Sequence, residues 1–188
     1  MAPTSDSGER AFRVGTYYDM MPIPPIDENC VALDAGPVRF VVESRHLTAA
    51  IARAALPAEK LPEEETRPGL DDHGASLHVY GSADGLEHLR FDCFDDDPHY
   101  HYVMHADGGQ LVVQLDPVAE GQVIAWVLGR MRDRLPEMLE YAGAAEVAAA
   151  VRADAGDADS VGRALREVAD LLGRADESAR AQYASAGS

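Results

Sequence analysis

Cysteine is scarce and long apolar runs are missing, and each absence excludes a class of protein. Only two cysteines, Cys30 and Cys93, occur among 188 residues. They lie far apart and outside any paired motif, which favours a reduced setting over a disulfide scaffold. No window approaches the unbroken apolar stretch that a membrane span needs. Residues 1–15 lack a basic start followed by an apolar stretch, so we expect no secretory signal and predict a cytoplasmic protein.

Positive charge is also scarce. Lys and Arg number 16 against 33 Asp and Glu, and the net charge is −17. A protein that binds phosphates must displace their counterions with clustered basic side chains. The densest basic cluster, Arg130, Arg132 and Arg134, alternates with Met131 and Asp133 along a predicted helix. We therefore expect neither nucleic acid nor an anionic membrane as a partner.

The chain divides into an arm, a domain and a tail. Residues 1–28 are polar and then proline-rich, and the prolines within positions 22–25 favour an extended arm. Residues 29–175 carry the periodic patterns of a single α+β domain, and residues 176–188 form a small polar tail. The arm carries aromatic, Met and Ile side chains, as partner-wrapping segments do. Either it lies across its own domain or, with the C-terminal helices, it binds a protein partner or a second copy of the chain.

Patterns with a period of two predict an antiparallel sheet. Residues 29–33 and 38–43 flank a turn and predict an N-terminal hairpin. Further along, the turn signals GSADGL, DDDP and ADGG separate four more strands. These strands cover residues 76–80, 87–94, 99–105 and 110–115. Together they predict a four-stranded meander.

Helical patterns fill most of the remaining chain. A helix is predicted over residues 46–56, followed by a solvated loop over 57–74. After Pro117, apolar residues fall on one broad stripe of a long helix, which Pro136 is expected to kink or divide. Two shorter helices follow, at about 144–153 and 160–174. The predicted fold is α+β, with the meander and the hairpin packed on one face by the long C-terminal helix.

The hairpin turns decide which strand residues face one another. If DDDP is a four-residue loop, Asp92 lies opposite His101, and a four-residue ADGG loop places His105 opposite Gln110. Alternate residues share a face, and a slip by one residue would mix the faces. One face then collects the apolar residues Leu77, Val79, Leu89, Phe91, Cys93, Tyr100, Tyr102, Met104, Leu111, Val113 and Leu115. The other collects the polar residues His78, Tyr80, His88, Arg90, Asp92, His99, His101 and His105.

This histidine-rich face suggests a metal site. His99 and His101 point the same way from one strand, and neutral imidazole and carboxylate are suitable ligands for Zn, Fe, Cu or Ni. Asp92, His88 or His105 is expected to complete the ligand set. Two histidines and one carboxylate would leave open positions, as in a metal-dependent enzyme acting on a small organic substrate. The residues placed to orient such a substrate are Tyr80, Arg90 and His78.

Three other interpretations of the same residues remain open. Antiparallel sheets often expose one face to water, and histidines there are ordinary polar residues. The face could also form an acid–base or ligand pocket without metal. Finally, the chain could be a non-catalytic accessory subunit that binds and stabilises a larger protein, with the arm as its contact.

Overall fold

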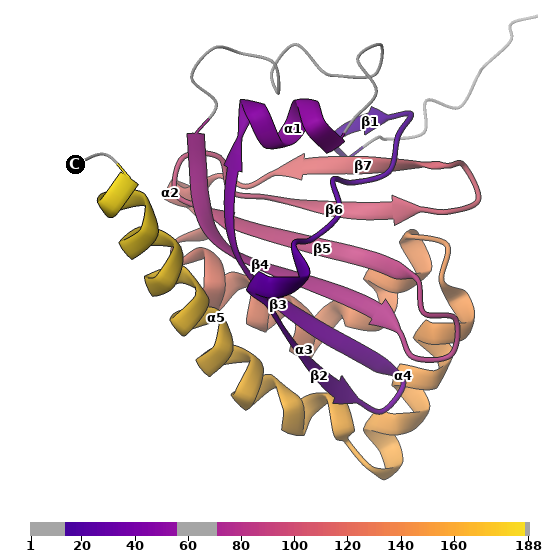
Figure 1. Ribbon diagram of the computed structural model, residues 1–188. Coiled ribbons are helices and arrows are strands. Elements are labelled where there is room, and N and C mark those ends of the chain that lie inside the picture. Colours follow the sequence, from indigo (N-terminus) through magenta and orange to yellow (C-terminus); the bar gives the residue numbers. More distant parts are fainter. Residues whose placement is uncertain (1–13, 56–70, 187–188) are drawn as a thin grey trace, which may run out of the picture.

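The computed structural model describes residues 14–55 and 71–186, and within these ranges seven strands form one antiparallel sheet in the order β1-β7-β6-β5-β4-β3-β2 (Figure 1). The strands are β1 Thr16–Tyr18, β2 Cys30–Ala35, β3 Val38–Thr48, β4 Asp71–Gly81, β5 Glu87–Phe94, β6 His99–Met104 and β7 Gly109–Gln114. The helices are η1 Asp27–Asn29, α1 Ala49–Ala55, α2 Pro117–Glu120, α3 Val123–Tyr141, α4 Ala145–Asp157 and α5 Ser160–Ala186. The predicted α+β class, with an antiparallel sheet and a long C-terminal helix, is confirmed.

Helices α3, α4 and α5 cover one face of the sheet (Figure 1). Helix α5 packs along β4, β3 and β2, while α3 crosses β5. Apolar residues that alternate along the strands, such as Phe40, Leu77 and Phe91, are fully buried against Met131 and Leu172 of the helices. Each such side chain stabilises the fold by about 1.5–3 kcal/mol. None of the helices in the described part of the chain is both long and apolar enough to cross a membrane.

The two faces of the meander are those predicted except that His88 and His105 lie toward α3 and α4, and the strand pairing is shifted by two residues. Asp92 lies opposite His99, and Arg90 takes the expected place of Asp92 opposite His101. At the next hairpin Gln110 lies opposite Val103, not opposite His105. The side-chain period of a strand is two, so a shift by two changes the partners and leaves the faces intact.

The loop after β5 explains the first shift. Cys93 and Phe94 pair with β4 but have no partner in β6, whose pairing with β5 stops at Asp92. The connection between β5 and β6 is therefore longer than DDDP alone. The carboxylate of Asp72 accepts hydrogen bonds from the backbone N–H groups of Asp96 at 3.2 Å and of Asp97 at 2.9 Å. Asp72 lies in residues predicted to be a loop, and a contact from there could not be anticipated.

Strands β3 and β4 are longer than expected. The prediction of a helix over 46–56 was wrong in its first part, because β3 continues to Thr48 and α1 begins only at Ala49. Residues 71–74, predicted as loop, belong to β4 and pair with β3. Their backbone hydrogen bonds extend both strands past the point where the apolar alternation stops. The rest of that predicted loop and the end of the helix, residues 56–70, lie outside the described residues.

Two further differences concern the C-terminal helices. Helix α3 continues through Pro136 as one helix, so of the predicted kink or division, the division is wrong. Helix α5 continues to Ala186, through residues 176–186 that were predicted as a polar tail. Tyr183, near its end, stacks on His73 of β4 with 4.1 Å between ring centroids. This contact gives the last turns of α5 a packing partner that its polar sequence does not indicate.

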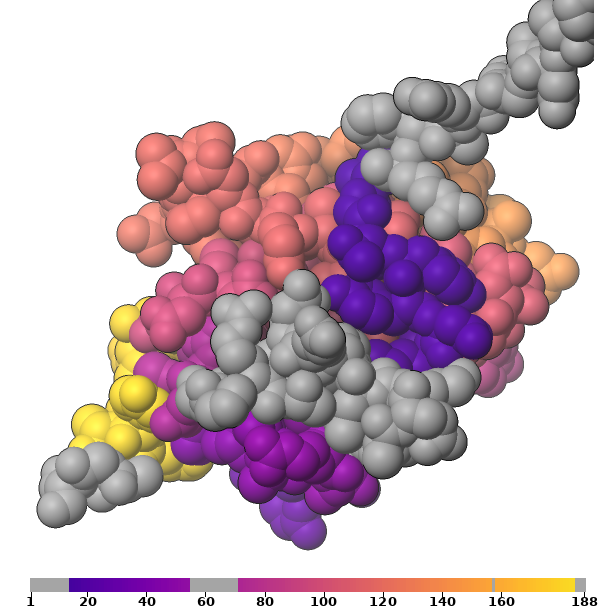
Figure 2. Space-filling view, turned by 90° about the horizontal axis from the view of Figure 1, so that it is seen from above, coloured from indigo at the N-terminus to yellow at the C-terminus, as the bar shows by residue number. Residues whose placement is uncertain are grey.

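The described part of the N-terminal arm lies on its own domain. Strand β1 pairs with β7 at one edge of the sheet. The chain then crosses the face opposite the helices, as the indigo segment of Figure 2 shows, and Met20, Pro22 and Ile23 are buried there. The histidine-rich face is therefore not a solvated surface, because His78 is 0% and His101 7% exposed.

Candidate functional site

Three potential metal ligands converge on the buried polar face. Asp92 comes from β5, and His99 and His101 come from β6. The Nε2 atoms of His101 and His99 lie 3.0 Å and 3.3 Å from the same carboxylate oxygen of Asp92, Oδ2. One ligand atom from each residue lies within 4.8 Å of the others, the spacing that a shared metal ion requires. The shifted strand pairing produces this arrangement, since it sets Asp92 opposite His99 and diagonal to His101.

The hydrogen bonds of the outer ring nitrogens orient both histidines. Nδ1 of His99 lies 2.6 Å from the backbone carbonyl of Asp97, which can only accept, so this nitrogen carries the hydrogen. Nδ1 of His101 lies 2.7 Å from Oε1 of Gln110. A ring that carries a hydrogen on Nε2 donates it to the Asp92 carboxylate, whereas a neutral ring with its hydrogen on Nδ1 faces that carboxylate with the Nε2 lone pair. A cation or a proton between them removes this repulsion, and a ring held by its outer nitrogen is typical of metal-ligating histidine.

Hydrogen bonds at Asp92 favour its ionised form, although burial opposes it. Burial raises the pKa of Asp92, but hydrogen bonds from His101 and His99 outweigh it and hold this pKa well below its usual range. The hydroxyl of Ser76 donates to the second carboxylate oxygen at 2.5 Å. Burial lowers the pKa of His101, whereas the Asp92 carboxylate overcomes burial at His99 and raises its pKa. The site therefore offers an ionised carboxylate beside a neutral imidazole.

The arm closes a small cavity over these ligands. The cavity has a volume of about 30 Å³, enough for one ion or water molecule and too small for an organic substrate. The backbone carbonyl of Ile23 in the arm accepts hydrogen bonds from Arg90 at 2.7 Å and from Arg45 at 3.3 Å. The lining residues are Met20, Met21, Pro22, Ile23, Arg45, Leu47, Arg90, Asp92, His99, His101 and Gln110.

A buried network of charges supports the cavity from one side. Arg45 pairs with Glu43 at 2.6 Å, and Arg90 pairs with both carboxylate oxygens of Glu87 at 2.8 and 2.9 Å. His78 bridges the two pairs, with Nδ1 2.7 Å from Glu87 and Nε2 3.3 Å from Glu43. Removing one member of such a pair leaves an uncompensated buried charge, which costs several kcal/mol. The network therefore holds the strands and the arm in one arrangement.

Sequence reasoning missed several members of this network. Glu43 ends the strand predicted over 38–43 and was not weighed as a site residue, whereas Arg45 lies one alternation step beyond it, so a longer strand would have placed Arg45 on the polar face. Ser76 and Gln110 belong to predicted strands and were not weighed as site residues. Glu87 enters through a bulge in the pairing of β4 with β5, which pairs it with Tyr80. No local sequence signal indicates that bulge.

The other predicted ligands lie apart from the three that converge. His88 and His105 contact each other with 5.6 Å between ring centroids, and both line a pocket on the side of α3 and α4. Of the residues expected to orient a substrate, His78 and Arg90 belong to the charged network. Tyr80 lies next to His78 at the edge of another pocket, and burial raises its pKa to about 12.

The chain was compared with families of known proteins, with curated proteins and with solved structures. Residues 32–172 match a family model described as a domain of unknown function, DUF7700, and the matched range contains all three converging ligands. No curated protein and no solved structure matches the chain.

Proposed function

We propose that this chain, which belongs to the DUF7700 family, binds a divalent transition metal ion through Asp92, His99 and His101. The observation that supports the proposal most directly is the convergence of three ligand atoms within 4.8 Å on two buried side chains and one, that of His99, which is 12% exposed. Two imidazoles and one carboxylate suit zinc, iron, copper or nickel better than calcium or magnesium, which prefer oxygen ligands.

The surroundings of the three residues also fit a metal ion. Asp97 and Gln110 fix the rings of His99 and His101, so the Nε2 lone pairs point at the cavity. Such outer partners raise ligand basicity, and their loss lowers metal affinity by about 10- to 100-fold. The cavity of about 30 Å³ accepts an ion without moving the strands.

The same geometry is compatible with catalysis of a metal-dependent reaction. Two histidines and a carboxylate occupy part of a coordination sphere and leave positions for water or substrate. A small organic substrate can reach them only after residues 20–23 of the arm move, because these residues cover the cavity. We therefore propose that any catalytic activity of the chain depends on displacement of the arm.

Metal content tests the binding proposal. The purified chain is loaded with Zn²⁺ or Co²⁺, dialysed and analysed by elemental mass spectrometry and by cobalt absorption spectra. We expect one equivalent of metal in the wild type and in His73→Ala, a buried histidine outside the site. His101→Ala and the milder Asp92→Asn should hold less than a tenth of an equivalent. Circular dichroism shows whether each variant is folded.

Equal metal content in His101→Ala and His73→Ala would contradict the proposal. The alternative of an accessory subunit would then gain support if a stoichiometric protein partner also co-purified with the metal-free chain. The described part of the arm, residues 14–28, contacts its own domain, which leaves the helices and the β2 edge of the sheet for such a partner.

A further inference from the structure

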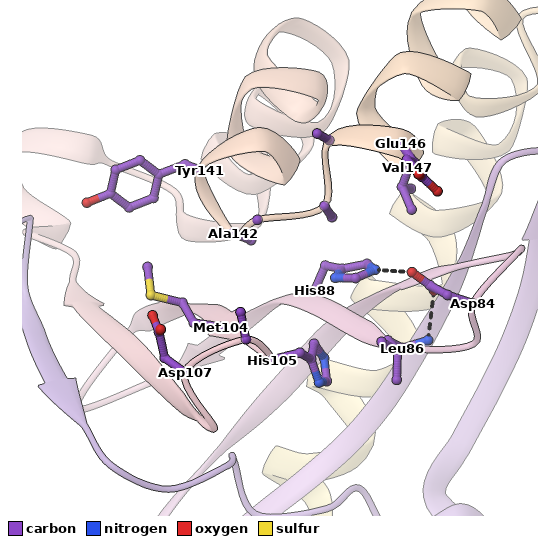
Figure 3. Close-up of a pocket in the computed structure, with 14 residues that line it drawn as sticks. Asp84, Leu86, His88, Met104, His105, Asp107, Tyr141, Ala142, Glu146 and Val147 are labelled. Atoms are coloured by element: carbon purple, nitrogen blue, oxygen red, sulfur yellow. Dashed lines mark hydrogen bonds and ion pairs between the residues drawn. The ribbon is translucent and has the colours of Figure 1, made fainter.

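A second pocket lies on the opposite side of the sheet from the candidate metal site. It has a volume of about 590 Å³, within the usual range of about 300–1,000 Å³ for small-molecule sites. Three connections form it: the β4–β5 turn, the β6–β7 turn and the α3–α4 loop. Figure 3 shows the loop as the roof and the sheet as the floor. Gly85, Gly108 and Gly143 take positive φ angles in these connections, which allows each sharp turn.

The polar side chains of this pocket include three carboxylates. Asp84, Asp107 and Glu146 line it, and neither lysine nor arginine occurs among the described residues around it. Asp84 accepts hydrogen bonds from the backbone N–H of Leu86 at 3.0 Å and from His88 at 3.0 Å. These bonds outweigh burial and lower the pKa of Asp84, so its carboxylate is ionised. The pocket thus has an unbalanced negative charge that attracts a cation.

His88 adds an unused hydrogen-bond acceptor to the floor. Its side chain is 5% exposed, and its ring stands on the sheet facing the α3–α4 loop (Figure 3). Nε2 donates to Asp84, which leaves Nδ1 as a lone pair in the neutral ring. Nδ1 is buried and has no partner among the described residues. A buried polar atom without a partner is unfavourable, and a ligand that brings an N–H group relieves this.

The remaining walls are apolar and include one aromatic ring. Met104, Ala142 and Val147 supply aliphatic surface around the opening between sheet and loop (Figure 3). Tyr141 is 46% exposed at the rim and packs against Tyr102, with 4.6 Å between ring centroids. An exposed aromatic face beside carboxylates is a favourable contact for an organic ammonium group.

We propose that this pocket binds a small organic cation, a protonated amine carried on an apolar body. Asp84, Glu146 and Nδ1 of His88 recognise the ammonium group at one end of the pocket, and the aliphatic walls with Tyr141 hold the body (Figure 3). Asp107, beside Met104 toward the other end, adds to the negative charge of the pocket. The proposal is independent of the metal site, because none of the three proposed metal ligands lines this pocket. A neutral ligand lacks the charge contact, and an anionic ligand is repelled.

Three isosteric probes test the charge preference. Benzylamine, benzyl alcohol and benzoate are titrated into the full chain, and binding is followed by isothermal calorimetry and by amide chemical shifts. We expect benzylamine to bind and to shift the amide signals of residues 84–88 and 142–147. Benzyl alcohol should bind about five- to tenfold more weakly and benzoate not at all, and salt should weaken only the amine.

Charge-matched variants test the location. Asp107→Asn/Glu146→Gln removes two exposed carboxylates of the pocket, and Asp170→Asn/Glu177→Gln removes two exposed carboxylates of α5 outside it. We expect the first pair to weaken benzylamine about three- to tenfold and the second to leave it unchanged. Tyr141→Ala should weaken it about two- to fivefold, through the lost aromatic contact.

Several outcomes would overturn the proposal. The first is that benzoate binds as tightly as benzylamine. The second is that the two charge-matched variants weaken benzylamine equally, and the third is that the amide shifts are confined to residues outside the pocket. The fourth is that benzylamine does not bind at about 10 mM, tenfold above a Kd of about 1 mM. A Kd of about 1 mM is that of a weak small ligand and corresponds to about −4 kcal/mol.

Discussion

Arg90→Met tests whether the buried charged network holds the arm and the sheet together. The Arg90 side chain is 2% exposed and makes three hydrogen bonds, two to Glu87 and one to the carbonyl of Ile23. Methionine fills much of the same space and removes all three bonds. It leaves the Glu87 carboxylate, 12% exposed, without its arginine.

The expected loss follows from that burial. Breaking a buried ion pair by removing one partner costs about 3–5 kcal/mol of unfolding free energy. For a chain of this size, each kcal/mol lowers Tm by about 2–4 °C, so we expect Arg90→Met to melt on the order of 10 °C lower. Urea unfolding followed by circular dichroism measures the free energy directly.

Arg152→Met is the matched control. Arg152 also makes a two-bond contact with a glutamate, Glu140, at 2.6 and 3.0 Å, but both side chains are nearly half exposed. Water and salt screen such a pair, so its loss should change Tm little. Glu87→Gln/Arg90→Met should recover part of the loss of the single Arg90 variant, since no unpaired charge remains. Equal melting of Arg90→Met and Arg152→Met would refute the reasoning.

Three further predictions concern the sheet and the site. Gln110→Leu should lower metal affinity about 10- to 100-fold, because Nδ1 of His101 loses its hydrogen-bond partner. A competition assay with a chromophoric chelator measures this, and an unchanged affinity would contradict the role assigned to Gln110. Gly74→Ala should lower the free energy of unfolding by about 1–3 kcal/mol, since its Cβ would lie 2.4 Å from the backbone oxygen of Cys93. Burial raises the pKa of Glu87, but its arginine partner outweighs burial and lowers this pKa to about 2. Because the folded pKa lies below the unfolded one, we expect on the order of 3 kcal/mol of stability to be lost as the pH falls from about 4.5 to 2. Urea unfolding at several pH values measures this loss, and Glu87→Gln should show a flatter pH profile over that range.

The sequence was informative where one face of an element is apolar. Alternation along the meander predicted both faces of the sheet, because a shift by one residue would have exposed Leu89 and Phe91. It therefore also predicted that Asp92, His99 and His101 share a face. Both features depend only on side-chain period and on the burial of apolar surface, which are local properties of the chain.

Features that depend on contacts between residues far apart in the sequence could not be predicted from side-chain periodicity. The strand pairing depends on a loop held by Asp72, which lies 24 and 25 residues before the two N–H groups that it accepts from, those of Asp96 and Asp97. His88 left the polar face and Glu87 entered it through a bulge opposite Tyr80. A hydrogen bond or a bulge of this kind forms only when the strands are already assembled.

The sequence by itself determined the fold class, the apolar face of the meander and the shared face of Asp92, His99 and His101. Only the tertiary structure decided that this face is buried beneath the arm and that Asp92 joins His99 and His101 while His88 and His105 do not. The physical reason is that periodicity specifies the face of a residue, whereas the partner across a strand depends on loop length and on hydrogen bonds from remote segments.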